Sequence, residues 1–194
     1  MDDLDAVAAI EGRRSIRKFK PEPVARPLLE ELLTLAGCAP SCENTQPWKF
    51  VVLEGQIKDE VIEVIHDKAT SLKKDEVAIG SCLENVRSMR QSPAIVMVYR
   101  INSEEDEEIE LPSYRGDITD ALSIGAAIEN FLVAATAKGL GTLWIRDVLL
   151  AEEEINEIIE EEGRLMSALA VGHAVEQPDS LERKPLKEFV SWRE

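Results

Sequence analysis

The alternation of apolar and polar positions divides the chain into helical and extended segments. Apolar residues recur every three or four positions in several stretches, a spacing that places them on one face of an α-helix. In one stretch Pro27 stands where a first helical turn tolerates proline, and the helix is expected to end near Gly37. The predicted helices cover residues 3–11, 25–37, 56–70, 117–138 and 151–163.

Shorter apolar runs between these segments predict β-strands. Residues 93–100 form a continuous apolar run, which is typical of a strand covered on both faces. The segment that begins at Trp48 is rich in β-branched and aromatic residues, which favour extended structure. The predicted strands cover residues 48–55, 93–100, 141–148 and 164–174, whereas residues 71–92 fit either helix or irregular structure.

The order of these elements predicts one α+β domain over residues 1–194. The helix at 117–138 is nearly apolar throughout its second half, so we expect it in the middle of the molecule. The last segment, residues 175–194, has a polar start and contains two prolines. We expect it to form an extended arm that lies along another surface.

Composition and charge limit the possible partners. The chain has 194 residues, of which 44% are hydrophobic, so it is long enough to bury a core. Its net charge of -16 disfavours binding to nucleic acids and to anionic membrane surfaces. The N-terminus carries acids where a secretory signal carries bases, and the three cysteines are an odd number that argues against a disulfide framework. We therefore expect a cytoplasmic protein.

The sequence provides few candidates for metal or dinucleotide chemistry. Cys38 and Cys42 flank Pro40, which excludes a regular helical turn, and we expect free thiols that are buried or half-buried and no metal site. The glycines of "KGLGTLW" follow a helix and open a strand, the reverse of a dinucleotide fingerprint, and predict a helix C-cap and a tight turn. The acidic run at residues 102–110 is expected to be a solvated loop.

A basic segment near the start of the chain stands out against this acidic background. Five of the eight residues from Arg13 to Lys20 are cationic. Arg13, Ser15 and Arg17 are spaced two apart, so in an extended conformation they project from the same side. Two guanidiniums and a hydroxyl on one side suit a phosphate monoester. A solvated loop with ordinary surface ion pairs is the alternative.

A polar turn supplies a second candidate motif. In "APSCENTQPWKFVVL", several amides and hydroxyls stand between the end of a predicted helix and the start of a predicted strand. Such groups are able to bind the donor and acceptor edges of a heteroaromatic ring. The alternative is a turn in which Asn and Ser side chains bond to their own backbone.

The basic segment and the polar turn belong to a series of four segments in a fixed order. These are "RRSIRKF", "APSCENTQPWKFVVL", "AIENFLVAATAKGLGTLWI", and "ALAVGHAVEQP" followed by "RKPLKEFV". Together they resemble the nitroreductase family of FMN-dependent oxidoreductases, from about Ile10 to Val190. The resemblance implies an α+β nitroreductase-like fold, with a central mixed β-sheet surrounded by helices and an extended C-terminal arm in a homodimer. It also implies FMN at the subunit interface.

The resemblance further implies which residues bind FMN. Arg17 is the candidate for stabilising negative charge on the reduced ring, and no protein acid or base is expected to be obligatory. The implied FMN-binding residues are Arg13, Arg14, Ser15 and Arg17 from one subunit, Pro40, Ser41, Asn44 and Gln46 from the other, Gly141, Thr142 and Leu143 against the ring, and Arg183 at the phosphate.

The implied activity is transfer of hydride from NADH or NADPH through the flavin to a small organic acceptor such as a nitroaromatic compound or a quinone. A specialised flavin reaction, such as reductive dehalogenation or flavin fragmentation, is an alternative on the same fold. A flavin-binding sensor or storage protein is another, and so is an interaction protein that has lost its flavin. We expect a homodimer with an interface on the order of 2,000–5,000 Å², because a lone subunit would leave the apolar helix and the polar turn partly uncovered.

Overall fold

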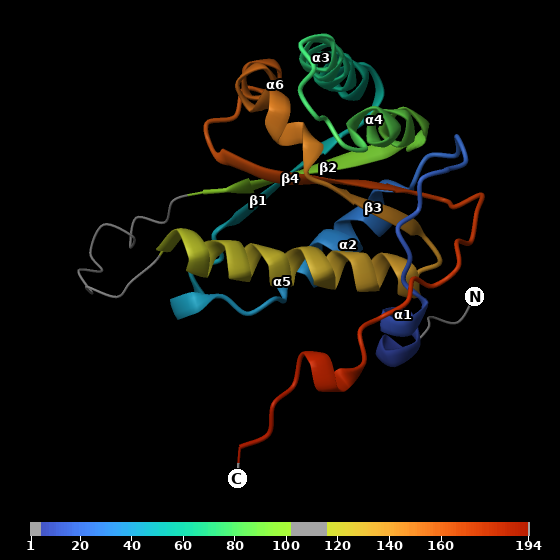
Figure 1. Cartoon of the computed structure of the whole chain (residues 1–194), viewed down its shortest axis with the longest axis vertical. Helices are drawn as coiled ribbons and strands as arrows, with labels where there is room; N and C mark the ends of the chain where they lie inside the picture. The colour runs from blue at the N-terminus through green and yellow to red at the C-terminus, as the bar shows by residue number, and fades with distance from the viewer. Residues whose placement is uncertain (1–4, 102–115, 194) are drawn as a thin grey trace.

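The structure is a computed structural model that describes residues 5–101 and 116–193. Four strands form one sheet in the order β1-β2-β4-β3, and they pair antiparallel throughout. The expected α+β class with helices on both sides of a sheet is confirmed (Figure 1), whereas the expected mixed strand direction is limited to an isolated parallel bridge between Ser15 and Thr142. The strands are β1 (Trp48–Leu53), β2 (Ala94–Arg100), β3 (Gly141–Ile145) and β4 (Arg164–Gly172).

Strand β2 is buried on both faces. Ile95 and Met97 belong to the apolar cluster on one side of the sheet, and Val96 and Val98 belong to the cluster on the other. Successive side chains of a strand point to opposite faces, so a strand with two covered faces requires an unbroken apolar run. The prediction for residues 93–100 is therefore confirmed.

Three helices cover the upper face of the sheet in Figure 1. The longest, α3, buries Val61, Ile62 and Ile65 at the spacing of one helical face. Their apolar side chains join the sheet residues in a single cluster. The helices are α3 (Gly55–Lys74), α4 (Cys82–Gln91) and α6 (Glu152–Ile159).

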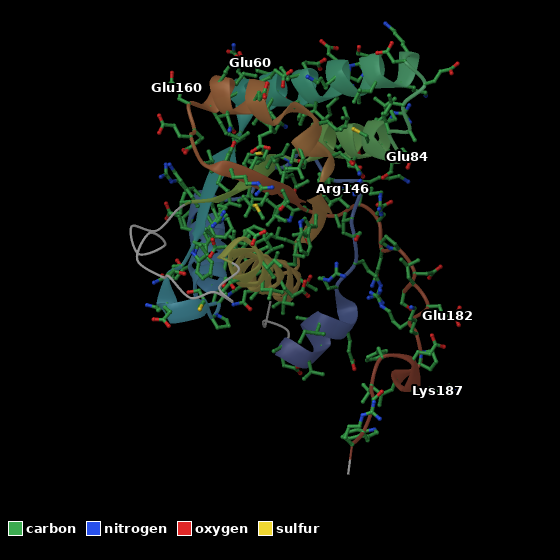
Figure 2. The ribbon with its side chains drawn as sticks, turned by 60° about the vertical axis from the view of Figure 1, so that its left-hand side comes forward. Glu60, Glu84, Arg146, Glu160, Glu182 and Lys187 are labelled. Atoms are coloured by element: carbon green, nitrogen blue, oxygen red, sulfur yellow. The ribbon has the colours of Figure 1, made fainter. Side chains whose placement is uncertain are left out.

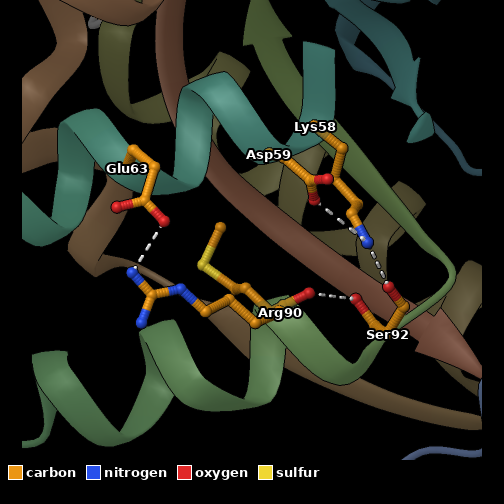
Figure 3. Close-up of polar contacts among 6 residues, drawn as sticks. Lys58, Asp59, Glu63, Arg90 and Ser92 are labelled. Carbon is orange, nitrogen blue, oxygen red and sulfur yellow. Dashed lines mark hydrogen bonds and ion pairs between the residues drawn. The ribbon is translucent and has the colours of Figure 1, made fainter. Parts of the chain in front are cut away.

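Polar contacts attach α3 to α4 (Figure 3). Arg90 donates to Glu63 over 2.8 Å, an exposed ion pair between the two helices. The Nζ atom of Lys58, which is largely buried, donates to the backbone carbonyl of Ser92 over 2.8 Å. An ammonium group at the end of α4 satisfies a carbonyl that the helix itself leaves unpaired.

The opposite face of the sheet is covered by a second helical layer (Figure 1). Helix α5 buries Ile124, Ile128 and Phe131 against this face, as expected for a central apolar helix. It is long and apolar enough to cross a membrane, but 44% of its most apolar window is buried inside the fold. A core helix accounts for that composition. The helices are α1 (Ala6–Gly12), α2 (Arg26–Gly37) and α5 (Gly116–Ala137).

Some boundaries differ from those predicted. Residues 71–92, which were compatible with helix or irregular structure, contain the end of α3 and the whole of α4. Strand β3 ends at Ile145, and a 3₁₀ turn, η3 (Asp147–Ala151), replaces its predicted last residues. The Asp147 carboxylate accepts a hydrogen bond from Asn85 over 2.6 Å, which draws this segment toward α4. The acidic run at 102–110 lies outside the described residues.

The chain after β4 leaves the fold as an extended arm, as predicted for residues 175–194 (Figures 1 and 2). Its one short turn is η4 (Leu186–Glu188), and Figure 2 shows Glu182 and Lys187 along the arm. Large apolar side chains are exposed on it, with Phe189 67% and Trp192 81% accessible. This apolar surface is uncovered in the single chain.

Candidate functional site

The basic segment, residues 13–20, lies in an extended conformation beside the edge strand β3. The backbone N–H of Ile16 donates to the carbonyl of Thr142 over 2.8 Å. The Ile16 side chain is buried in the apolar cluster on the α3 side. Because extended side chains alternate, burial of Ile16 turns Ser15 and Arg17 outward, and both are exposed.

Gly141 allows this close approach. A Cβ atom at position 141 would lie 2.8 Å from Cγ1 of Ile16, closer than carbon atoms pack. Ile16 is itself buried and has little room to move. The absence of a side chain at position 141 therefore sets how near the basic segment comes to β3.

The basic segment also pairs with the beginning of the arm. The Lys20 N–H donates to the carbonyl of His173 over 2.8 Å, and the Val175 N–H donates to the carbonyl of Lys18 over 3.1 Å. Phe19 and Ala174 form an antiparallel bridge at this point. This pairing joins the basic segment to the chain that follows β4.

A pocket of about 400 Å³ lies between the basic segment and the arm. One wall comes from the basic segment and the end of α1, and the other comes from the arm. Five of the predicted FMN-binding residues lie in this lining, namely Arg13, Arg14, Ser15, Arg17 and Arg183. The lining residues are Ile10, Glu11, Arg13, Arg14, Ser15, Arg17, Pro178, Asp179, Ser180, Leu181 and Arg183.

Within the part of the chain that the structure describes, Arg13, Arg14 and Arg17 make only loose or backbone contacts. Arg13 lies 3.8 Å from the carboxylate of Glu129, at the outer limit of an ion pair. Arg14 donates to the carbonyl of Glu11 over 2.7 Å, and Arg17 donates to that of Ser15 over 3.4 Å. Carbonyl acceptors orient a guanidinium without cancelling its charge. The pocket is therefore suited to an anion.

The residues predicted to lie against a flavin ring differ in which of their groups are available to contact a ligand. The Thr142 side chain is buried, and its Oγ1 atom has no hydrogen-bond partner within residues 5–101 and 116–193. Leu143 is buried in the apolar core, so its side chain is not available to a ligand. At Gly141 and Leu143, only the backbone is available for such a contact.

The polar turn lies apart from this pocket in the single chain. It follows α2, contains the 3₁₀ turn η1 (Cys42–Asn44), and packs near α5. None of Pro40, Ser41, Asn44 and Gln46 belongs to the pocket lining described above. The structure thus brings the basic segment and Arg183 together, and leaves the polar turn elsewhere.

The turn itself has an unusual backbone. Glu43, Asn44 and Gln46 have φ values of 54°, 58° and 49°, in the left-handed region that favours glycine. Ser41 Oγ accepts the N–H of Gln46 over 3.0 Å, which is the local side-chain bonding named above as the alternative. Left-handed non-glycine residues cost free energy and cluster at functional sites. The turn presents exposed polar groups in a fixed conformation.

Sequence reasoning missed Glu176, which lies at the start of the arm. Its Oε1 atom accepts the backbone N–H groups of Arg17 and Lys18 over 2.8 and 3.1 Å. Its Oε2 atom lies 3.5 Å from Nζ of Lys18. The contact joins residues 159 positions apart in the chain, so no local pattern signals it.

A second polar cluster, also missed, lies between α4 and η3. Asn85 donates to Asp147, and its own Oδ1 atom is buried without a hydrogen-bond partner among the described residues. Burial, and secondarily the charge of Asp147, raise the pKa of the neighbouring Cys82 thiol to about 11. This thiol is protonated and unreactive at neutral pH.

Cys38 and Cys42 are free thiols as expected, but the expectation that they are buried or half-buried is wrong. Cys38 and Cys42 are exposed, because the end of α2 and the polar turn lie at the surface.

On α3, the ligand atoms of Glu63, His66 and Asp67 lie within 4.8 Å of one another. The Glu63 carboxylate of that group is already bound to Arg90, and the group lies on the solvent side of the helix.

The sequence and the fold belong to a known class of protein. The sequence model of the nitroreductase family matches residues 10–173. This is most of the chain, and it includes the basic segment, the polar turn and β3. The chain belongs to the nitroreductase family.

Individual relatives cover nearly the whole chain. YfhC of Bacillus subtilis (strain 168), provisionally named an NAD(P)H nitroreductase, is 26% identical over 183 residues, covering 92% of this chain and 89% of YfhC. Iodotyrosine deiodinase of Nematostella vectensis is 28% identical, covering 94% of this chain and 72% of that protein. The crystal structure of a BluB-like flavoprotein from Clostridium difficile 630 is 27% identical, with a TM-score of 0.76 and coverage of 98% and 100%.

Proposed function

We propose that the protein is an FMN-dependent oxidoreductase that passes hydride from NADH or NADPH to a small organic acceptor such as a nitroaromatic compound or a quinone. The observation that carries the proposal is the pocket in which Arg13, Arg14, Arg17 and Arg183 meet. The family, the NAD(P)H nitroreductase relative and the flavoprotein relative support a flavin as its ligand.

The residues of the pocket fit a phosphorylated flavin. Its volume of about 400 Å³ lies within the range of small-molecule sites, and its donors are guanidiniums and one hydroxyl. Micromolar binding requires about 8 kcal/mol. Two or three charge-assisted hydrogen bonds to the phosphate, at roughly 1.5 to 3 kcal/mol each, supply much of that free energy. An uncharged ribityl end would leave these cations unused, which favours FMN over unphosphorylated flavin.

The chain's own residues bind and orient the cofactor in this proposal. FMN, when bound, supplies the chemistry of accepting hydride from NAD(P)H and passing it on. Arg13, Ser15 and Arg183 bind the phosphate, and Arg17 places a cation where negative charge develops on the ring. The unpartnered Thr142 hydroxyl and the backbone around Gly141 are polar groups available to the ribityl chain or the ring.

The polar turn enters the site through a second subunit in this proposal. In the single chain it lies away from the pocket, and α1, α5 and the arm all expose apolar side chains. A homodimer that covers these surfaces would supply the turn of one subunit to the pocket of the other. The acidic surface and the odd number of cysteines support a cytoplasmic protein that binds neither nucleic acid nor membrane.

A specialised flavin reaction is the second candidate. The deiodinase relative covers 94% of this chain at an identity similar to that of the nitroreductase relative. The two relatives therefore do not separate general nitro reduction from reductive dehalogenation. Purified enzyme assayed with a nitroaromatic, a quinone and a halogenated phenol would separate the two candidates by which acceptor is turned over.

The test of the main proposal is the absorption spectrum of the purified protein, followed by NADH and NADPH consumption with excess acceptor. We expect flavin bands and many turnovers per subunit. Oxidation of one equivalent of nicotinamide and no more would instead indicate a storage or sensor protein. A colourless protein that takes up no FMN from solution would refute the proposal.

A further inference from the structure

Glu176 contacts the basic segment at the point where that segment changes its pairing partner. Residues 15 and 16 pair with β3, whereas residues 18 to 20 pair with the arm. Between these two pairings, Oε1 of Glu176 accepts both the Arg17 and the Lys18 N–H groups, over 2.8 and 3.1 Å. Arg17 lies between the residues that pair with β3 and the residues that pair with the arm.

Two consecutive N–H groups that meet one oxygen atom define the local backbone. In a regular extended strand, successive N–H groups point to opposite sides, so a single oxygen atom cannot accept both. The backbone therefore departs from regular strand geometry at Arg17 and Lys18, so that both N–H groups point toward the carboxylate. A carboxylate that accepts two backbone N–H groups makes strong, charge-assisted hydrogen bonds.

The same contact fastens the arm. Glu176 follows the backbone pairing of Val175 with Lys18, and the pocket residues from Pro178 to Arg183 come next along the chain. The carboxylate thus fixes the direction in which the arm turns toward the pocket. It also fixes the backbone from which the Arg17 side chain projects.

We propose that Glu176 is a positioning residue, which holds Arg17 in the geometry that places its guanidinium at the flavin ring edge. The proposal rests on the FMN-dependent function proposed above. Glu176 contacts two backbone N–H groups and the Lys18 ammonium, and it is not part of the pocket lining. Its effect on the cofactor passes through Arg17.

The first measurement is hydrogen exchange of the Arg17 and Lys18 amides in the cofactor-free protein. Glu176→Ala removes the acceptor, so we expect both amides to exchange at least about tenfold faster than in the wild type, which corresponds to about 1.4 kcal/mol of lost protection. Glu176→Gln keeps an acceptor oxygen and is expected to show a smaller change. Unchanged exchange in Glu176→Ala would show that the Glu176 carboxylate does not hold these two amides, regardless of the result with FMN.

The second measurement is a fluorescence titration of FMN with Glu176→Ala, Arg17→Ala and the double variant. We expect Glu176→Ala to weaken FMN binding about tenfold, and the double variant to bind within about twofold of Arg17→Ala alone, because the two residues act through one contact. A merely structural role predicts that the two losses multiply. Multiplied losses, or an unchanged affinity in Glu176→Ala, would overturn the positioning role.

A matched control is Glu30→Ala, which breaks an exposed ion pair with Arg26 on α2. We expect no change in amide exchange at Arg17 or in FMN affinity. If the wild type takes up no FMN, both the proposed function and the positioning role are refuted. The exchange data still decide whether Glu176 holds the Arg17 and Lys18 amides. Failure of the inference and failure of the function are therefore distinguishable.

Discussion

Arg183 joins the pocket from the opposite end of the chain to the other arginines. We predict that Arg183→Gln weakens FMN binding by about 10- to 100-fold, because it removes a charge-assisted phosphate contact of roughly 1.5 to 3 kcal/mol. The fold should be unaffected, since the residue is exposed on the arm. A titration of FMN fluorescence against the apoprotein measures the change.

Lys187→Gln serves as the control for charge alone, because it removes an exposed cation from the same arm outside the pocket lining (Figure 2). It should leave the affinity nearly unchanged. Equal losses in the two variants would mean that general attraction by the arm, and not contact in the pocket, binds the phosphate.

We predict that the buried thiol of Cys82 lowers the free energy of unfolding at alkaline pH. Burial holds its pKa at about 11 in the folded state, against about 8.5 to 9 for a thiol in the unfolded chain. Between these values the unfolded state releases a proton that the folded state keeps, so the free energy of unfolding falls as pH rises from about 9 to about 11. Below about pH 8.5 the thiol is protonated in both states and contributes no pH dependence.

Urea unfolding at several pH values between 8 and 11 would test this effect. The Cys82→Ala variant is expected to be less stable at pH 8, because it loses buried volume, but to show a flatter decline above pH 9. Parallel declines in the two proteins would assign the alkaline loss to other groups.

At the scale of elements, the site depends on how closely the basic segment packs against β3. We predict that Gly141→Ala lowers the free energy of unfolding by about 1 to 3 kcal/mol, because the new methyl group overlaps Ile16. Relief of this overlap would shift Ser15 and Arg17, so FMN affinity should also fall. Chemical denaturation and FMN titration measure the two effects.

Gly37→Ala is the matched comparison, because no atom lies within 4 Å of its added methyl group and its helix favours alanine. Its stability should be unchanged or higher by up to about 1 kcal/mol. A Gly141→Ala variant as stable as Gly37→Ala would show that the segment is not tightly packed against β3.

At the scale of the whole molecule, exposed apolar surface predicts association. Leu122 on α5 is 71% accessible, and Val7 and Ile10 on α1 are 65% and 60% accessible. We predict a dimer in sedimentation, and a Leu122→Glu variant that is monomeric, folded and poor at retaining FMN. Its fold should persist because Leu122 makes little contact within its own chain.

Val77→Glu introduces the same charge at an exposed apolar position in the connection between α3 and α4, on the other side of the sheet. This variant should remain dimeric. A Leu122→Glu protein that stays dimeric with bound FMN would place the interface elsewhere on the molecule.

Local patterns predicted most of the elements and the basic segment that lines the candidate site. Periodicity identified the central apolar helix and the doubly buried strand β2, because those signals need only residues near one another in the chain. Spacing alone placed Arg13, Ser15 and Arg17 on one side of an extended segment. The resemblance to a known family was needed to include Arg183, which has no local signal.

The sequence by itself determined the α+β class, the alternation of helices and strands, and the gathering of cations in one basic segment. Only the tertiary structure decided that the strands pair antiparallel in the order β1-β2-β4-β3, that Gly141 admits Ile16, and that Glu176 clamps Arg17 from 159 positions away. The physical reason is that periodicity and spacing report on neighbours along the chain. Close approach, carboxylate clamps and strand order arise from contacts between distant segments, which become definite only when the chain packs.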